Sequence, residues 1–176
     1  LESTELKALL GDKLFVEELG EKIRIREDCG ARIVVLHTGV FFMGGDPIAQ
    51  PFALTRKDFE TPLGPAEADQ EFLDALLARV GPGYLEDEFA HRGEHSIAFQ
   101  AVFLRHVIPA GRPVRIVPVL CGSFHQQVEA RRAPAQGDRT EAFLGALRDT
   151  MAAVGGRTLV LASADLAHVG PQFGDP

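Results

Sequence analysis

Three short apolar runs, rich in β-branched residues, constrain the fold of this chain more than any other feature. They occupy residues 31–37, 114–120 and 158–162. Apolar runs of this length without polar alternation are typical of strands that are buried on both faces of a sheet. Segments with helical periodicity separate or flank them, at residues 66–80, 94–107 and 141–154. This alternation predicts an α/β fold with a mainly parallel sheet flanked by helices, in which the three runs are neighbouring strands.

Further helices, strands and loops are predicted from shorter patterns along the chain. The helix at 94–107 is apolar nearly all round, so we expect it to be buried. Residues 3–10 read as a short capped helix and residues 22–26 as an edge strand. The glycines and prolines of 41–51 predict a loop, and residues 52–55 alternate weakly as a strand.

Length and charge limit the class of protein. The 176 residues are enough for one domain with a substantial core, and 45% hydrophobic with 24% charged residues is ordinary globular composition. A net charge of −7 without a basic stripe argues against nucleic acid as a partner. No apolar run approaches the roughly 20 residues needed to cross a bilayer. Because the chain runs from Leu1 to Pro176, we read it as a single domain, 1–176, that lacks upstream and C-terminal parts of a longer protein.

Cysteine usage points to a reducing compartment. Cys29 and Cys121 are the two cysteines, and they form no CxxC pair, which argues against a disulfide framework or a cysteine-rich zinc site. No secretory signal pattern is visible, so we expect a cytoplasmic protein. Cys121 follows an apolar strand without an adjacent base and reads as a small core residue.

Polar residues gather directly after the predicted core strands, where ligands collect in open α/β sheets. They are His37, Cys121, His125, Asp165 and His168. His168, with Asp165 three residues before it, is a candidate general acid/base, because a carboxylate orients an imidazole and raises its basicity. The alternative is that Asp165 caps a turn and His168 is satisfied locally.

A second acid–imidazole pair, Glu94 and His95, begins the helix at 94–107. The pair is a candidate for metal or substrate binding, whereas Glu94 is also placed to cap the helix and complement its dipole. His95 is the stronger functional candidate because capping does not require a histidine. His37 is a candidate metal ligand, with a structural histidine in a turn as the alternative. His91 and His106 read as surface residues, and nucleotide-binding glycine motifs are absent.

These motifs resemble those of the Memo family, which is related to class III extradiol ring-cleavage dioxygenases. Residues 94–100, Glu-His-Ser-Ile-Ala-Phe-Gln, are similar to the family's E-H-S-I-E-x-Q helix, with Ala98 in place of its acidic residue. Residues 163–168, Ser-Ala-Asp-Leu-Ala-His, are similar to its S-S-D-x-x-H segment, and 116–118 to its I-V-P strand. Residues 52–55 and 61–64 also resemble its strand and T-P-L-G turn. The resemblance covers residues 31–176.

The resemblance implies a largely parallel α/β sheet with a metal-type pocket at its strand ends. His168 would serve as the acid/base, with Asp165, His95 and Glu94 beside it. The family's metal site draws on an upstream histidine, a histidine after a strand end and a ligand near the C-terminus. The first and last have no counterpart here, and His37 is offset from the second, which the family places near residue 40. We therefore expect iron or another divalent metal in the full-length protein, and weak or no binding by this chain.

Two functions remain open. The first is a metal-dependent, dioxygenase-like enzyme that acts on a small molecule. The second is a non-catalytic module, a pseudoenzyme, that holds a peptide or another protein in the same cleft.

Overall fold

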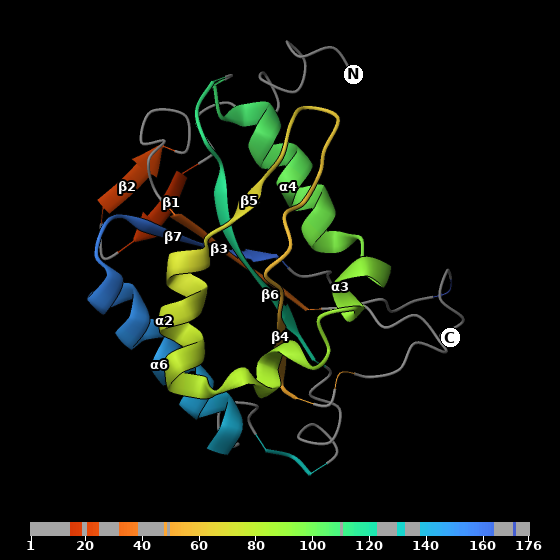
Figure 1. Ribbon diagram of the computed structural model, residues 1–176, viewed down its shortest axis with the longest axis vertical. Coiled ribbons are helices and arrows are strands. Elements are labelled where there is room, and N and C mark those ends of the chain that lie inside the picture. The colour runs from red at the N-terminus through yellow and green to blue at the C-terminus, as the bar shows by residue number, and fades with distance from the viewer. Residues whose placement is uncertain are drawn as a thin grey trace.

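The three predicted core strands lie side by side in one sheet. The computed structural model describes residues 15–18, 21–24, 32–38, 48, 50–109, 111–122, 130–132, 138–163 and 171. The sheet contains β3 (Arg32–Thr38), β4 (Phe52–Leu54), β5 (Glu67–Ala68), β6 (Arg115–Cys121) and β7 (Thr158–Ser163). Their order is β4-β6-β3-β7, and β5 also pairs with β6 (Figure 1). The predicted adjacency of the three core strands is confirmed.

The directions of the strands make the sheet mixed. β3 runs parallel to β6 and β7, and β5 runs parallel to β6. β4 runs antiparallel to β6. The predicted α/β class is confirmed, whereas the sheet that we expected to be mainly parallel is mixed. The sequence of a three-residue strand such as β4 does not show whether the strand runs parallel or antiparallel to its neighbour. That direction depends on the path by which the connecting segments bring β4 to β6.

Helices cover both faces of the sheet (Figure 1). The described helices are α2 (Gln70–Val80), the short 3₁₀ helix η2 (Pro82–Leu85), α3 (Ala90–Gly93), α4 (Ser96–Val107) and α6 (Asp138–Val154). α2 and α6 pack together over one face, and α4 covers the other. None of these described helices is long and apolar enough to cross a membrane.

Alternation along β6 divides the core between these two layers. Ile116 and Leu120 pack into the cluster with α4, whereas Val117 and Val119 pack into the cluster with α2 and α6. Successive side chains of a strand point to opposite faces, so a strand covered on both faces must be apolar throughout. This requirement explains the continuous apolar runs from which the sheet was predicted.

α2 begins later than its periodicity predicts because the preceding residues join the sheet. Glu67 and Ala68 pair with β6, and Asp69 then caps the helix by accepting a hydrogen bond from the Phe72 backbone N–H at 3.0 Å. Asp69 is buried and also accepts from Arg32 Nε at 2.7 Å. One carboxylate therefore ends β5, starts α2 and ties both to β3.

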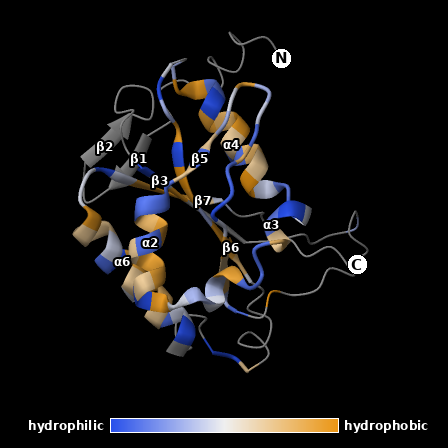
Figure 2. Cartoon of the chain, viewed as in Figure 1, coloured by the Kyte–Doolittle hydropathy of each residue, from blue (hydrophilic) through white to orange (hydrophobic). Residues whose placement is uncertain are grey.

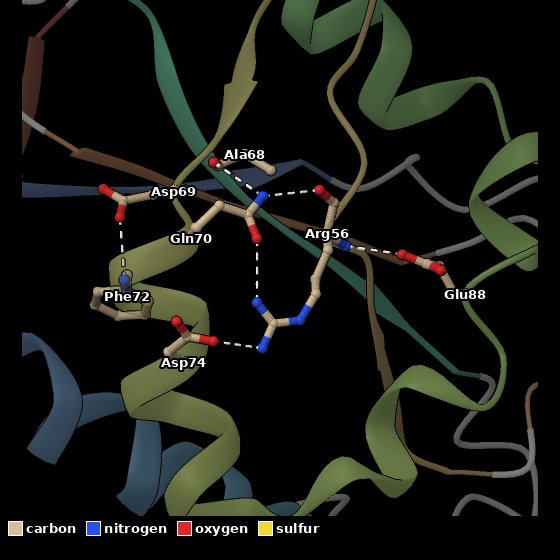
Figure 3. Close-up of polar contacts among 7 residues, drawn as sticks. All are labelled: Arg56, Ala68, Asp69, Gln70, Phe72, Asp74 and Glu88. Carbon is tan, nitrogen blue, oxygen red and sulfur yellow. Dashed lines mark hydrogen bonds and ion pairs between the residues drawn. The ribbon is translucent and has the colours of Figure 1, made fainter.

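A polar cluster fastens the chain after β4 to α2 (Figure 3). The Arg56 guanidinium donates to Gln70 Oε1 at 3.1 Å and to Asp74 Oδ1 at 2.5 Å. Gln70 Nε2 donates back to the Arg56 carbonyl at 2.8 Å, and the Arg56 backbone N–H donates to Glu88 Oε1 at 2.9 Å. These bonds connect three segments that are separate in the sequence, and they hold the chain that follows β4 against α2.

α4 is amphipathic, which corrects the prediction that it is buried all round. Ile97, Ala101 and Leu104 face the sheet, but the side chains of Phe99 and Phe103 are 54% and 51% exposed. Figure 2 shows hydrophobic residues along much of α4 as well as in the central strands. Hydropathy alone does not distinguish the buried face of α4 from its exposed face, because phenylalanine occurs both in protein cores and on protein surfaces.

The other predicted elements agree in part. α6 begins at Asp138, three residues before the predicted start at 141. The predicted edge strand at 22–26 corresponds to β2 (Glu21–Arg24), which pairs antiparallel with β1 (Phe15–Glu18). The predicted helix at 3–10 and most of the loop at 41–51 lie outside the described residues.

Candidate functional site

The carboxyl ends of β3, β6 and β7 lie at the same edge of the sheet. His37 of β3 is in register with Leu120 of β6 on one side and with Ser163 of β7 on the other. Ser163 is the last residue of β7 and the first residue of the motif at 163–168. The backbone therefore brings His37 next to the point at which this motif begins.

α4 runs from this edge toward the opposite edge. Gln100 Nε2 donates to Ser163 Oγ at 3.0 Å, at the carboxyl end of β7. One turn later, Arg105 Nη1 donates at 3.0 Å to the carbonyl of Arg112, which precedes β6. Because β6 and β7 share one direction, the first turn of α4 lies at the carboxyl ends of the strands. The motif at 94–100 thus lies at the edge where Ser163, the first residue of the motif at 163–168, ends β7.

Glu94 and His95 have different environments at the start of α4. Glu94 Oε1 accepts a hydrogen bond from the Ser96 backbone N–H at 3.0 Å, and only 11% of its side chain is exposed. Glu94 thereby satisfies the backbone N–H of the first residue of α4, although His95 and not Glu94 is the N-cap residue. His95 is 64% exposed, lies 3.9 Å from Glu94 Oε1 through Nδ1, and contacts the Phe99 ring edge-on at 5.3 Å. A side chain with this exposure is free to meet a ligand.

The other candidates are only partly described. Asp165, His168 and His125 lie outside the described residues, and His37 is described through its backbone alone. The predicted convergence of His37, His95, Asp165 and His168 therefore remains a prediction for the side chains. Among the side chains that are described, no group of three or more His, Cys, Asp or Glu residues is arranged to hold a metal ion. These residues by themselves do not make a three-ligand metal site.

Cys121 has the environment of a core residue. It ends β6, is buried, and its thiol is free. Burial raises the pKa of the Cys121 thiol to about 11. A thiol with this pKa is protonated at neutral pH, so it lacks the thiolate character of an activated nucleophile.

His91 corrects a second prediction, since it is buried rather than on the surface. Only 7% of His91 is exposed, and its Nε2 donates to the Ala53 carbonyl at 3.1 Å. Its Nδ1 is buried without a hydrogen-bond partner among the described residues. Burial lowers the pKa of His91, although the Ala53 hydrogen bond and the nearby charges of Glu88 and Glu94 act in the opposite direction.

Nothing in the local sequence around His91 indicates burial. The four-residue helix α3 is too short to show a periodicity that would identify its buried face, and its orientation depends on packing against β4.

Glu88 lies just before α3 in the sequence. Burial by itself would raise the pKa of Glu88, but hydrogen bonds from the Arg56 backbone N–H and the Thr55 hydroxyl outweigh it and hold that pKa below its ordinary value.

The chain matches known proteins over most of its length. A family model described as "Memo-like protein" matches residues 32–176. A MEMO1 family protein of Methanopyrus kandleri is 35% identical over 137 residues, which cover 77% of this chain and 41% of the relative. Corresponding proteins of Thermus thermophilus and Aquifex aeolicus are 34% and 29% identical over 129 and 126 residues. These two alignments cover 73% and 72% of this chain, and 33% and 30% of the relatives.

The chain thus spans well under half the length of these relatives, and no solved structure matches it. The match includes the motifs at 94–100 and 163–168, and it extends over the sheet and the helices on both faces. On this match, the chain belongs to the family of Memo-like proteins.

Proposed function

We propose that this Memo-like chain forms part of a pocket of the type used by non-haem, metal-dependent class III extradiol dioxygenases. The observation that supports the proposal is the hydrogen bond from Gln100, in the first motif, to Ser163, the residue that begins the second motif at the carboxyl end of β7. In this proposal His168 transfers a proton to or from a catechol-like or other small substrate. Asp165 and His95 position the reacting groups, and Glu94 fixes the first turn of α4.

We assign no chemical step to a metal in this chain, because its described side chains do not form a three-ligand site. Iron or another divalent metal is proposed for the full-length form, in which His37 would be one of several ligands. A metal held by a single histidine is mostly hydrated and readily lost. We also propose that the protein is cytoplasmic.

Elemental analysis, combined with oxygen uptake, tests this function. The full-length protein and the 176-residue chain are purified without chelator, and iron, zinc and copper are measured in each. We expect near-stoichiometric metal in the full-length protein and little in the chain. His37→Ala should remove the metal, whereas His168→Ala should retain it and lower catechol-dependent oxygen consumption by about 100-fold or more, as expected for a lost acid/base.

A non-catalytic binding module is the second candidate, because α4 exposes an aromatic surface beside the proposed pocket. His95, Phe99 and Phe103 follow at intervals of four residues, and each has more than half of its side chain exposed. Metal-free full-length protein that consumes no oxygen with catechols would overturn the enzyme proposal in favour of this module. Peptide binding by the module should then be lost in Phe99→Ser/Phe103→Ser and survive in His168→Ala.

A further inference from the structure

β7 lies at one edge of the sheet, and one side of its backbone points away from its neighbour. Among the strands that the structure describes, β7 pairs only with β3. The Arg32 backbone N–H donates to the Arg157 carbonyl at 2.8 Å, so the polar backbone groups of every second residue from 157 onward point toward β3. The N–H and C=O groups of the residues between them, Thr158, Val160 and Ala162, therefore point away from the sheet.

This edge lacks the features that usually prevent a strand from pairing with another chain. Edge strands are often very short, or they carry charged residues, proline or a bulge. β7, Thr-Leu-Val-Leu-Ala-Ser, is uncharged and without proline, and its register with β3 is continuous over its 6 residues. The strand at the opposite edge, β4, has only 3 residues, follows Pro51 and is closely followed by Arg56 and Lys57. The contrast indicates that the outer edge of β7 receives a further strand.

The side chains of β7 are apolar on both faces of the sheet. Leu159 and Leu161 pack with α4, whereas Val160 packs with α2 and α6. Leu161 and Val160 are only half-buried, as expected beside an edge. A strand that pairs here must therefore present apolar side chains on both faces. β7 itself has this pattern, and it carries no charge through which two copies would repel each other.

We propose that β7 is a dimer interface, at which two copies of this chain pair antiparallel and continue one sheet. A two-fold axis perpendicular to the sheet keeps the corresponding faces of the two copies on the same side. Directly opposite residues then share a face, so Val160 lies opposite the Val160 of the second copy, and Leu159 lies opposite Leu161. This register also places Thr158 opposite Ala162, and it forms about six main-chain hydrogen bonds from the groups that point outward.

α4 supplies further contact area beside this edge. A specific dimer buries roughly 800 Å² per partner, more than the edge of one short strand provides. α4 lies over β7, because Gln100 donates to Ser163 and the cluster of α4 includes Leu159. Phe103 follows Gln100 by three residues, so it lies on the side of α4 that is nearer to the edge of β7. Phe103 is 51% exposed, and pairing through β7 brings the α4 of the second copy to this side.

Sedimentation velocity of the 176-residue chain tests the association. The net charge of −7 opposes dimerisation, so we expect a dissociation constant of about 20 µM and a mainly monomeric chain at about 2 µM. Val160→Lys places two ammonium groups opposite each other and should raise the dissociation constant about tenfold or more. Val160→Thr keeps the β-branched shape, and Ala78→Lys adds the same charge to the exposed face of α2, so both should dimerise like the wild type. Circular dichroism of the dilute variants checks their fold.

Cross-linking tests the register in a Cys29→Ser background, in which the thiol of Cys121 is buried and protonated. Opposite residues of a hydrogen-bonded antiparallel pair have Cα atoms about 5.5 Å apart, a distance that a disulfide spans. Val160→Cys should therefore form a covalent dimer when it is oxidised with diamide. Ala162→Cys is the control, because its position is more exposed but lies roughly 14 Å from the same position of the second copy. This variant should remain largely uncoupled.

Amide hydrogen exchange of peptides that span 158–163 identifies what pairs with the edge. Exchange should be about fourfold slower at about 200 µM than at about 2 µM, because the monomer fraction falls by this factor. Protection that does not depend on concentration would overturn the proposal, since another segment of the same chain would then pair with β7. A chain that remains monomeric at about 200 µM would overturn it as well.

A dimer that Val160→Lys does not weaken would show that the copies meet elsewhere. Equal cross-linking of Ala162→Cys and Val160→Cys would exclude the register, and either result contradicts the proposal. The interface does not depend on the function proposed above. Retained catechol-dependent oxygen consumption in His168→Ala of the full-length protein would contradict that function and leave the pairing of β7 unaffected.

Discussion

Gln100 Nε2 lies 3.0 Å from Ser163 Oγ, and this bond joins the two motifs that carry the family resemblance. One motif begins α4 and the other begins at the last residue of β7. His37 lies in register with Ser163 on the neighbouring strand. The topology of the sheet and this contact from α4 therefore organise the described part of the candidate site.

His91 should make stability depend on pH in the mildly acidic range. Because burial lowers the pKa of His91 below 6.5 in the folded state, the unfolded chain binds the proton more readily. The free energy of unfolding should therefore be unaffected by His91 above pH 6.5, and fall as the pH drops below this value. The limiting slope is about 1.4 kcal/mol per pH unit for one proton.

Urea denaturation between pH 7 and pH 5 measures this slope. His91→Gln should give a shallower dependence, because glutamine retains an N–H donor for the Ala53 carbonyl and does not titrate. His106→Gln serves as the control at an exposed position on α4. Equal slopes for the wild type and His91→Gln would show that other groups, such as the carboxylates, cause the dependence.

Replacement of Asp69 should destabilise the fold far more than replacement of Asp74. Asp69 is 2% exposed, pairs with Arg32 and caps α2, so Asp69→Ala leaves a nearly buried guanidinium unpaired. We expect a loss of about 3 kcal/mol or more in the free energy of unfolding. Asp74 is 67% exposed in its pair with Arg56, so Asp74→Ala should cost less than about 1 kcal/mol. Comparable losses from chemical denaturation of the two variants would contradict this assignment.

The two faces of α4 should respond differently to truncation. Ile97 is 1% exposed, and Ile97→Ala should cost about 2 to 5 kcal/mol because it leaves a cavity against the sheet. Phe99→Ser and Phe103→Ser remove side chains that are more than half exposed, so each should cost about 1 kcal/mol or less. Thermal unfolding measures both effects. A large loss in either phenylalanine variant would indicate that its exposed side chain has a partner in solution.

Cys121 should resist alkylation in the folded protein. Its pKa of about 11 leaves little thiolate at pH 8, and its burial limits access of the reagent. In a Cys29→Ser background, mass spectrometry should detect iodoacetamide labelling of Cys121 at least about tenfold more slowly than in urea. Labelling of Cys121 at the same rate in the folded protein and in urea would contradict the burial of its thiol.

Much of the architecture could be predicted because the pattern of apolar residues in a segment shows which of its faces are buried. The apolar run of β6 is continuous because Ile116 and Val117 face different helix layers, and the same logic identified β3 and β7. Polar residues that follow the strand ends predicted a site at this edge of the sheet, and for their side chains this remains a prediction. The family resemblance rests on residues that are adjacent in the sequence, so it too was visible without coordinates.

Features that depend on contacts between distant segments could not be read in this way. The direction of β4, the burial of His91 and the exposure of Phe99 each follow from how one element lies against another. The periodicity of a short segment does not show how that segment packs against distant parts of the chain. The Gln100–Ser163 bond is of the same kind, since two half-buried polar residues give no sign of each other along the chain.

The sequence by itself therefore determined the α/β class, the three adjacent core strands and the family, because hydrophobic periodicity and contiguous motifs are local properties. Only the tertiary structure decided that the sheet is mixed, that α4 exposes aromatic side chains and that Gln100 reaches Ser163. The physical reason is that burial and hydrogen bonding between segments arise when helices and strands pack, and packing is a property of the whole fold.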